Sequence, residues 1–106
     1  DARATASLEA AIRSQIAPCW NPPIGGADVK KMTVVLHIDL QRDGSVIGRP
    51  SKVSQSGVTA GNSDYARAFE ETARRAVLRC APFKLPPEMF EAWKSFELNF
   101  DPSEMT

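Results

Sequence analysis

The chain has 106 residues, which is enough for one domain with a thin hydrophobic core and too few for two. Thirteen basic residues balance thirteen acidic ones, which excludes the strong positive field of a nucleic-acid-binding protein. No apolar run approaches the roughly 20 residues needed to cross a bilayer. Because the sequence begins at Asp1 and shows no signal sequence, we expect a fragment of a longer protein, with any membrane anchor outside it.

The first predicted element is an amphipathic helix over residues 7–17. Its apolar residues recur at every fourth position: Leu8, Ile12 and Ile16. Pro18 ends the regular helix, and an irregular connector with two prolines and two glycines follows over residues 19–28. Trp20 and Ile24 are large apolar groups in this connector, so we expect both to anchor it to the core.

Residues 32–41 predict the clearest strand. The residues on its apolar face alternate along the chain: Val34, Leu36, Ile38 and Leu40. An Asp-Gly turn at 43–44 follows, which indicates a hairpin because glycine accepts the positive φ of such turns. We expect the returning strand to begin at Val46 and to weaken near Pro50, and the serine- and glycine-rich residues 51–61 to form a loop.

A second helix is predicted from Asn62 or Ser63 to about Arg79. Its buried stripe has helical spacing: Tyr65, Phe69, Ala73, Ala76, Val77 and Cys80. Charged residues occupy the remaining surface: Glu70, Glu71, Arg74, Arg75 and Arg79. We interpret them as a solvated face with the ion pairs Glu70–Arg74 and Glu71–Arg75, and a docking patch formed by the three arginines is the alternative.

The rest of the chain completes an α+β pattern. Three elements are expected: an extended stretch over 81–87, a short helix over 88–93 and a strand over 96–100. The order predicts a small three-stranded antiparallel sheet with helices packed on one face. We place one domain at residues 8–102, between the end of an upstream linker at 1–7 and a tail at 103–106.

No catalytic, cofactor-binding or metal-ligating arrangement stands out in the sequence. His37 is the only histidine, which excludes a site with two histidine ligands. It sits on the polar strand face beside Asp39, and we interpret it as a solvent-facing residue, with general acid–base catalysis as the alternative. Gly25-Gly26 lacks the Gly-Lys-Ser/Thr ending of a phosphate loop. We therefore predict no enzyme activity, no cofactor and no metal site.

Cys19 and Cys80 are the only cysteines. As an even pair in a small domain they fit one disulfide in an oxidising compartment, and two buried thiols in a cytosolic protein are the alternative. Both fall at the C-terminal ends of core-facing helical stripes, so contact between them is geometrically reasonable. A disulfide closing such a loop stabilises a fold by roughly 4 kcal/mol.

A three-stranded sheet cannot close on itself, so at least one edge is expected to be open. The unpaired main-chain groups of such an edge can accept a strand from another protein. The last strand is a candidate because it ends the domain: Phe96, Glu97, Leu98, Asn99 and Phe100. The alternative is that a loop or charged side chains block this edge, as in many natural sheets.

Several segments together carry a family resemblance. Ile-Ala-Pro-Cys-Trp-Asn-Pro-Pro at 16–23 follows a short amphipathic helix, and the strand and turn at 34–46 come next. The helix end and extended stretch at 73–87, and Phe-Glu-Leu-Asn-Phe-Asp-Pro at 96–102, complete the series. In order and spacing these segments resemble the C-terminal domain of TolA, within the TolA/TonB C-terminal domain superfamily, from about residue 8 to 102.

The resemblance implies a periplasmic partner-binding domain of the Tol-Pal system. In that family the full-length protein is anchored in the inner membrane and, with TolQ and TolR, couples inner-membrane energy to TolB and Pal, which supports envelope integrity and cell division. Colicins and phage coat protein use the same domain as a receptor. Partners dock partly by strand addition, which implies the strand 96–100 as a docking edge. No nucleic-acid partner is implied, and the domain is expected to be monomeric.

The resemblance also bears on the cysteines. The periplasm is oxidising, which favours a disulfide between Cys19 and Cys80. Some family members place the second cysteine nearer the start of the second helix, so the family's connectivity is not copied here. Two alternatives remain. One is a TonB-type energy-transducer domain acting on outer-membrane transporters, and the other is a small periplasmic enzyme or redox protein with a reactive thiol.

Overall fold

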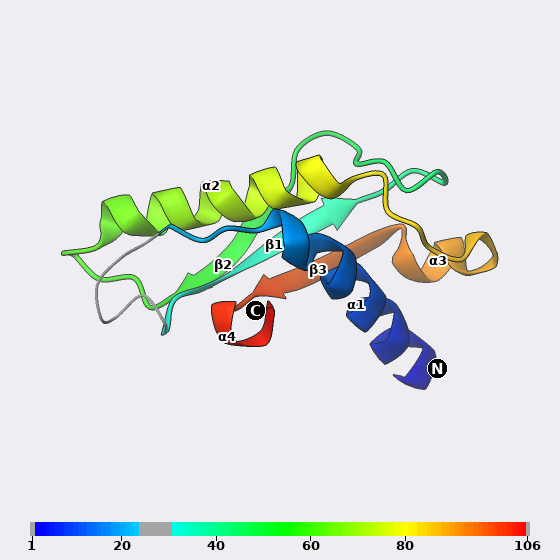
Figure 1. Ribbon diagram of the computed structural model, residues 1–106, viewed down its shortest axis with the longest axis horizontal. Coiled ribbons are helices and arrows are strands. Elements are labelled where there is room, and N and C mark those ends of the chain that lie inside the picture. Colours follow the sequence, from blue (N-terminus) through cyan, green and yellow to red (C-terminus); the bar gives the residue numbers. More distant parts are fainter. Residues whose placement is uncertain (1, 24–30, 106) are drawn as a thin grey trace.

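The structure is a computed structural model that describes residues 2–23 and 31–105, with side chains from Ser7 to Pro23 and from Lys31 to Glu104. It is an α+β fold built on a three-stranded antiparallel sheet of strand order β2–β1–β3, which confirms the predicted fold class (Figure 1). The strands are β1 Thr33–Asp39, β2 Ser51–Ser56 and β3 Ser95–Phe100. The helices are α1 Ala2–Ile16, α2 Ser63–Cys80, α3 Phe90–Trp93 and α4 Pro102–Met105, with short 3-10 helices η1 Ala17–Cys19 and η3 Pro87–Met89.

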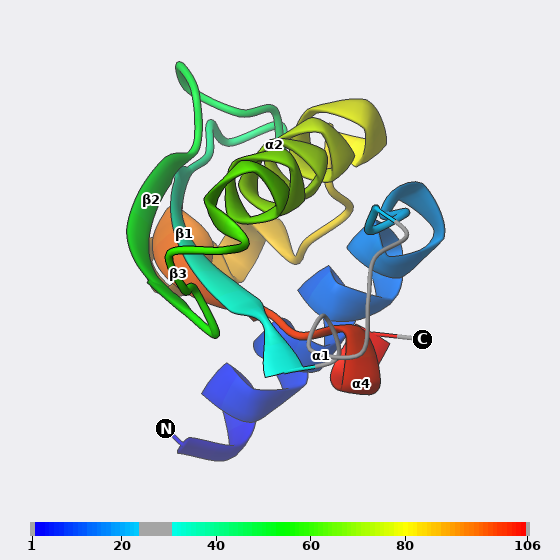
Figure 2. The same ribbon diagram turned by 90° about the vertical axis from the view of Figure 1, so that its left-hand side faces the viewer.

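The two longer helices lie on the same side of the sheet (Figure 2). The hydrophobic core fills the space between them and the sheet. The core takes alternating residues from β1 and from the position on either side of it, all at most 1% exposed: Met32, Val34, Leu36, Ile38 and Leu40. The residues between them are half-buried and mostly polar, as predicted for this strand. The alternation determines which face of the sheet the helices cover.

Helix α1 begins at Ala2, earlier than the predicted start at residue 7. The apolar period starts only at Leu8, but alanines at 2, 4 and 6 favour helix without adding to an apolar face. Trp20 anchors the connector as predicted. Its ring meets those of Phe69 and Phe100 edge to face at centroid distances of 5.5 and 5.3 Å, and its Nε1 donates to Thr72 Oγ1 at 3.3 Å. Ile24 lies outside the described residues.

The predicted hairpin is only partly right. Gly44 has φ of 87°, as the Asp-Gly turn requires, but the returning chain makes a single bridge between Leu40 and Val46. Strand β2 instead covers Ser51–Ser56, within the segment predicted to be a loop. Its residues are almost all exposed, so main-chain pairing with β1 rather than burial of an apolar face holds it in place. Without apolar alternation, the sequence gives no strand signal there.

Helix α2 buries the predicted apolar stripe, with Phe69, Ala73, Ala76 and Val77 fully buried. The interpretation of its charged residues is wrong at Arg74, which is only 8% exposed. Arg74 pairs with Glu70 as predicted and also with Glu71, which was expected to pair with Arg75. The Nε atom of Arg74 donates to the Pro50 carbonyl at 2.7 Å. Position 74 packs beside the buried stripe because the chain before β2 passes over this part of α2 and supplies an acceptor.

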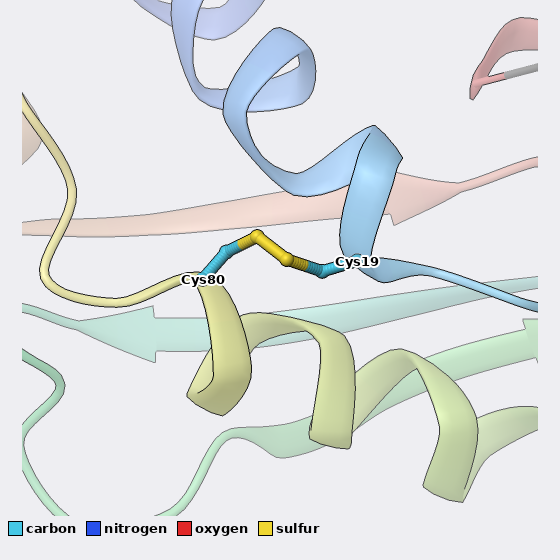
Figure 3. The surroundings of a disulfide bond; sticks show 2 residues. All are labelled: Cys19 and Cys80. Atoms are coloured by element: carbon cyan, nitrogen blue, oxygen red, sulfur yellow. A yellow bond between two sulfur atoms is a disulfide. The ribbon is translucent and has the colours of Figure 1, made fainter.

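A disulfide joins Cys19 at the end of η1 to Cys80 at the end of α2, with the two Cα atoms 6.1 Å apart (Figure 3). Of the two alternatives left open by the cysteines, the structure has the bridged pair. It ties the N-terminal helix to α2 across 61 residues of chain. A second link joins the same regions, because the Gln15 amide both donates to and accepts from the main chain of Lys84, at 2.9 and 2.8 Å.

The C-terminal elements follow the prediction closely. An extended stretch leads into η3 and α3, and the strand β3 pairs antiparallel with β1 in a continuous register from Val34–Phe100 to Asp39–Ser95. Trp93 of α3 is buried, and its Nε1 donates to the Pro86 carbonyl at 2.8 Å. Helix α4 occupies positions expected to be a tail.

Candidate partner-binding edge

The candidate site is the outer edge of β3. This strand lies at the end of the sheet, so β1 occupies only one of its two sides (Figure 1). The N–H of Leu40 donates to the Lys94 carbonyl at 2.8 Å, and these residues stand opposite each other just beyond the paired strands. In an antiparallel ladder, hydrogen-bonded residue pairs alternate with non-bonded pairs. The bond between Leu40 and Lys94 therefore shows which pairs of β1 and β3 are hydrogen-bonded. The even-numbered residues of β3 therefore bond to β1: Phe96, Leu98 and Phe100.

The odd-numbered residues of β3 direct their main-chain groups away from the sheet. Ser95, Glu97 and Asn99 each present an N–H and a C=O on the outer edge. Within residues 2–23 and 31–105, no main-chain hydrogen bond from another segment reaches these groups. The described part of the chain thus leaves a row of unpaired donors and acceptors that matches the edge of an incoming strand.

The side chains of β3 divide as the alternation predicted. Leu98 and Phe100 are buried and Phe96 is half-buried against the core, whereas Glu97 is exposed and Asn99 is half-buried on the opposite face. The register places Glu97 across from His37 of β1. Glu97 forms no ion pair with any residue that the structure describes.

A groove of about 160 Å³ runs between this edge and the first helix. Its lining comes from α1, α3 and β3: Leu8, Glu9, Ile12, Ala92, Trp93, Phe96, Glu97 and Leu98. Six of these eight residues are apolar and two are acidic, and none is basic. An added strand beside β3 would therefore place every second side chain over an apolar surface.

The other edge of the sheet is less suited to accept a strand. The register of β1 with β2 shifts between Val35 and Leu36, which is a bulge in the ladder. Lys52 is exposed beside it. Bulges and lysines are the devices by which natural sheets discourage pairing at an edge. Strand β3 carries neither device, because its pairing is regular and its six residues contain no lysine.

The polar contacts around His37 form no catalytic triad. His37 Nε2 lies 3.0 Å from Asp39 Oδ1 and 3.2 Å from Ser95 Oγ. In a triad the acid and the nucleophile bind opposite nitrogens of the imidazole, so that one orients the ring while the other loses its proton. Here both oxygens meet the same nitrogen. The Ser95 hydroxyl and then His37 lower the pKa of Asp39 below its ordinary value, which stabilises a carboxylate.

Neither a metal site nor a membrane span is found in the part of the chain that the structure describes. No three or more histidine, cysteine, aspartate or glutamate side chains gather there in a way that could hold a metal ion. No described helix is both long and apolar enough to cross a membrane.

The chain matches the model of a protein family over most of its length. The model of the family described as "Uncharacterised conserved protein UCP034077" matches residues 2–103, nearly the whole chain. The chain belongs to this family. A search of curated proteins and a search of solved structures each returned no match.

Membership of the UCP034077 family corrects the resemblance to TolA. The matching family is not a TolA or TonB C-terminal domain family. The segments that suggested TolA lie at 16–23, 34–46, 73–87 and 96–102, and in this small α+β fold they cover η1 and its connector, β1 and its turn, the end of α2 with the extended stretch, and β3. Such elements recur in unrelated families, so similar order and spacing did not establish kinship. The partners that the resemblance implied lose that support.

Sequence reasoning located part of this site. The alternation in residues 96–100 predicted a strand with Glu97 and Asn99 on the face away from the core, and the position of this strand at the end of the domain made it the candidate edge. It missed the contribution of α1 to the groove, through Leu8 and Ile12, and that of Trp93. The sequence predicts Leu8 and Ile12 only as part of the apolar stripe of the first helix, and Trp93 only as the end of a short helix. No local pattern distinguishes a helix stripe that fills the core from one whose first turns extend past a sheet edge.

Proposed function

We propose that this member of the UCP034077 family is a protein-interaction domain that takes an extended segment of another protein as a fourth strand beside β3. The observation that carries the proposal is the unpaired main-chain row at Ser95, Glu97 and Asn99, which borders an apolar groove. Main-chain hydrogen bonds supply affinity in this mode, and the groove selects among side chains at alternate positions. The domain acts by binding and not by catalysis.

The rest of the fold supports this use by holding the edge rigid. Two residues that line the groove, Leu8 and Ile12, belong to α1, which the disulfide links to α2. On the other side Trp93 is fixed by its hydrogen bond to Pro86. A preformed site loses less conformational entropy when a partner binds than one that must first become ordered.

The disulfide also favours an oxidising compartment, where such bonds persist. We propose that the domain works there, and a periplasmic site would meet this requirement. The alternative of a redox protein has less support, because the described structure pairs Cys19 with Cys80 and leaves no described cysteine as a free thiol.

Amide hydrogen exchange followed by NMR tests the proposed docking mode. The probe is a short peptide of alternating threonine and valine, added in excess to the whole chain. We expect exchange to slow at Glu97 and Asn99, because their N–H groups become bonded, while the Phe96 and Leu98 amides are slow with or without peptide. Val53 and Gln55 of β2 serve as the comparison edge and should not respond.

The substitution Asn99→Pro provides the matched variant. Proline removes the outward N–H at this position, and because that N–H is not bonded to β1, the ladder of the domain is kept. We expect the peptide to lose its effect while the circular dichroism spectrum stays native. Leu98→Pro removes an inward N–H and should damage the sheet itself. Slowed exchange on β2 alone, or no response of Glu97 to any peptide, would refute the proposal.

A further inference from the structure

The charged side chains that line the groove all have the same sign. Its lining holds two carboxylates, Glu9 and Glu97, and no basic side chain. Glu9 is engaged with Arg13 on the same helix, with 3.3 Å between Oε1 and Nη2. Glu97 has no ion-pair partner among the described residues, and its side chain is exposed. An uncompensated negative charge therefore stands in the middle of the open edge.

We infer that the segment bound at β3 carries a lysine or arginine opposite Glu97, flanked on both sides by apolar residues. The inference rests on the proposed function, since it specifies the partner of that same edge. Glu97 is here a specificity-determining residue, which selects a basic partner and rejects an acidic one through charge repulsion.

The geometry of strand pairing places these residues. The main-chain groups of Glu97 face outward, so an incoming residue directly opposite shares its face of the sheet, with Cβ atoms about 5 Å apart. The neighbours of that residue turn to the other face, where Leu8 and Ile12 line the groove. A basic residue between two apolar ones thus meets a carboxylate and an apolar surface at the same time.

A second copy of this chain fits the edge less well. Two β3 strands paired antiparallel about a two-fold axis at Glu97 would put two carboxylates directly opposite each other. Like charges in that position destabilise a strand pair. A partner with the complementary charge has no such cost, so in the register centred on Glu97 the charge of the edge favours a different protein over self-association.

Titration calorimetry with three matched peptides tests the inference. Each peptide alternates threonine and valine, and the central polar position holds lysine, glutamine or glutamate. We expect the lysine peptide to bind about two- to fivefold more tightly than the glutamine peptide, and the glutamate peptide more weakly still. Because the pair is exposed, the preference should shrink as salt is added.

Charge reversal assigns the preference to one residue. In Glu97→Lys the order of the three peptides should invert, so that the glutamate peptide binds most tightly. Glu88→Lys is the matched control, since Glu88 is an exposed acid on η3 outside the groove lining, and it should leave the order unchanged. Circular dichroism and size-exclusion chromatography confirm that both variants remain folded and show whether the chain pairs with itself.

The possible results distinguish the proposal of strand addition at β3 from the inference of a basic residue opposite Glu97. Equal binding of all three peptides, together with slowed exchange at Glu97 and Asn99, would refute the basic-partner inference and keep strand addition. A Glu97→Lys variant that still binds the lysine peptide most tightly would also refute the basic-partner inference and leave strand addition standing. If no peptide binds or protects the edge, both fail, and a stable dimer through β3 would replace an external partner with a second copy.

Discussion

Arg74 Nε donates to the main-chain carbonyl of Pro50 at 2.7 Å, so a buried arginine of α2 holds the chain just before β2. The same guanidinium pairs with Glu70 and Glu71, and all three of its nitrogen atoms are engaged. Arg49 extends the network through its own bond to Glu71, at 2.7 Å. This arrangement gives the exposed edge strand a fixed starting point that its own side chains do not supply.

We predict that Arg74→Ala lowers the free energy of unfolding by about 3 kcal/mol, because it leaves the Pro50 carbonyl and a partly buried Glu70 without their main partner. Arg75→Ala, one residue on, removes an exposed arginine and should cost less than about 0.5 kcal/mol. Urea unfolding followed by circular dichroism compares the two. Equal and small losses of stability in the two variants would show that Arg74 does not hold the chain before β2.

The sequence predicted the helices and strands in which buried and exposed side chains alternate with a regular period. The apolar alternation in β1 and the helical stripe in α2 both reflect packing against one core, and period alone locates them. Strand β2 escaped prediction because main-chain bonds to β1 hold it, and its serines read as loop. The burial of Arg74 was not predicted, for a related reason. Helical spacing does not show which charged residue of a helix a distant segment, such as the one at Pro50, will cover.

The candidate site could be predicted only in part, because its position depends on contacts between segments that are distant in the sequence. Alternation in residues 96–100 defines an inward and an outward face, but it does not say which edge of the sheet the strand occupies. That depends on the strand order, and the crossover from β2 through α2 to the far side of β1 is a tertiary property. The same holds for the approach of Leu8 to β3, which brings together residues from the two ends of the chain.

Substitutions at Gly44 and Gly48 test how closely the Asp-Gly turn at 43–44 packs against the rest of the fold. Gly44 has φ of 87°, and a Cβ there would clash with the main chain of Phe83, whose N–H donates to the Gly44 carbonyl at 2.9 Å. We predict that Gly44→Ala destabilises the domain by about 3 kcal/mol or more, through backbone strain and the clash together. Thermal unfolding provides the measurement.

Gly48 is the matched control for that comparison. It also has positive φ, at 68°, but a Cβ there would meet no atom within 4 Å. Gly48→Ala should therefore carry the backbone strain alone, about 1 kcal/mol. If both variants lose the same stability, the close approach of the turn at Gly44 to Phe83 contributes nothing.

The pKa of Asp39 offers a test of the polar cluster at the start of β3. The Ser95 hydroxyl, followed by His37, holds this pKa below the ordinary value of 3.8. We predict that Ser95→Ala raises it, as seen by NMR titration of the carboxyl carbon. Because a lowered folded-state pKa stabilises the fold only above the unfolded value, the contribution of Ser95 should be full above about pH 5 and vanish as pH falls through the folded pKa. Ser45→Ala should instead raise the pKa of Asp43. A pKa of Asp39 unchanged in Ser95→Ala would contradict the assignment.

The disulfide should matter for the docking edge as well as for stability. Closing 61 residues of chain, it is expected to contribute about 4 kcal/mol, so Cys19→Ala with Cys80→Ala should lower the melting temperature by about 15 °C. The reductant TCEP should cause a similar loss in the natural chain and none in the double variant. Because the bond helps to fix α1, the side of the groove formed by Leu8 should loosen first, and amides of α1 should exchange faster than those of β1. Two titratable thiols in the unreduced protein, or equal exchange in α1 and β1 of the variant, would show that the cysteines do not support the edge in this way.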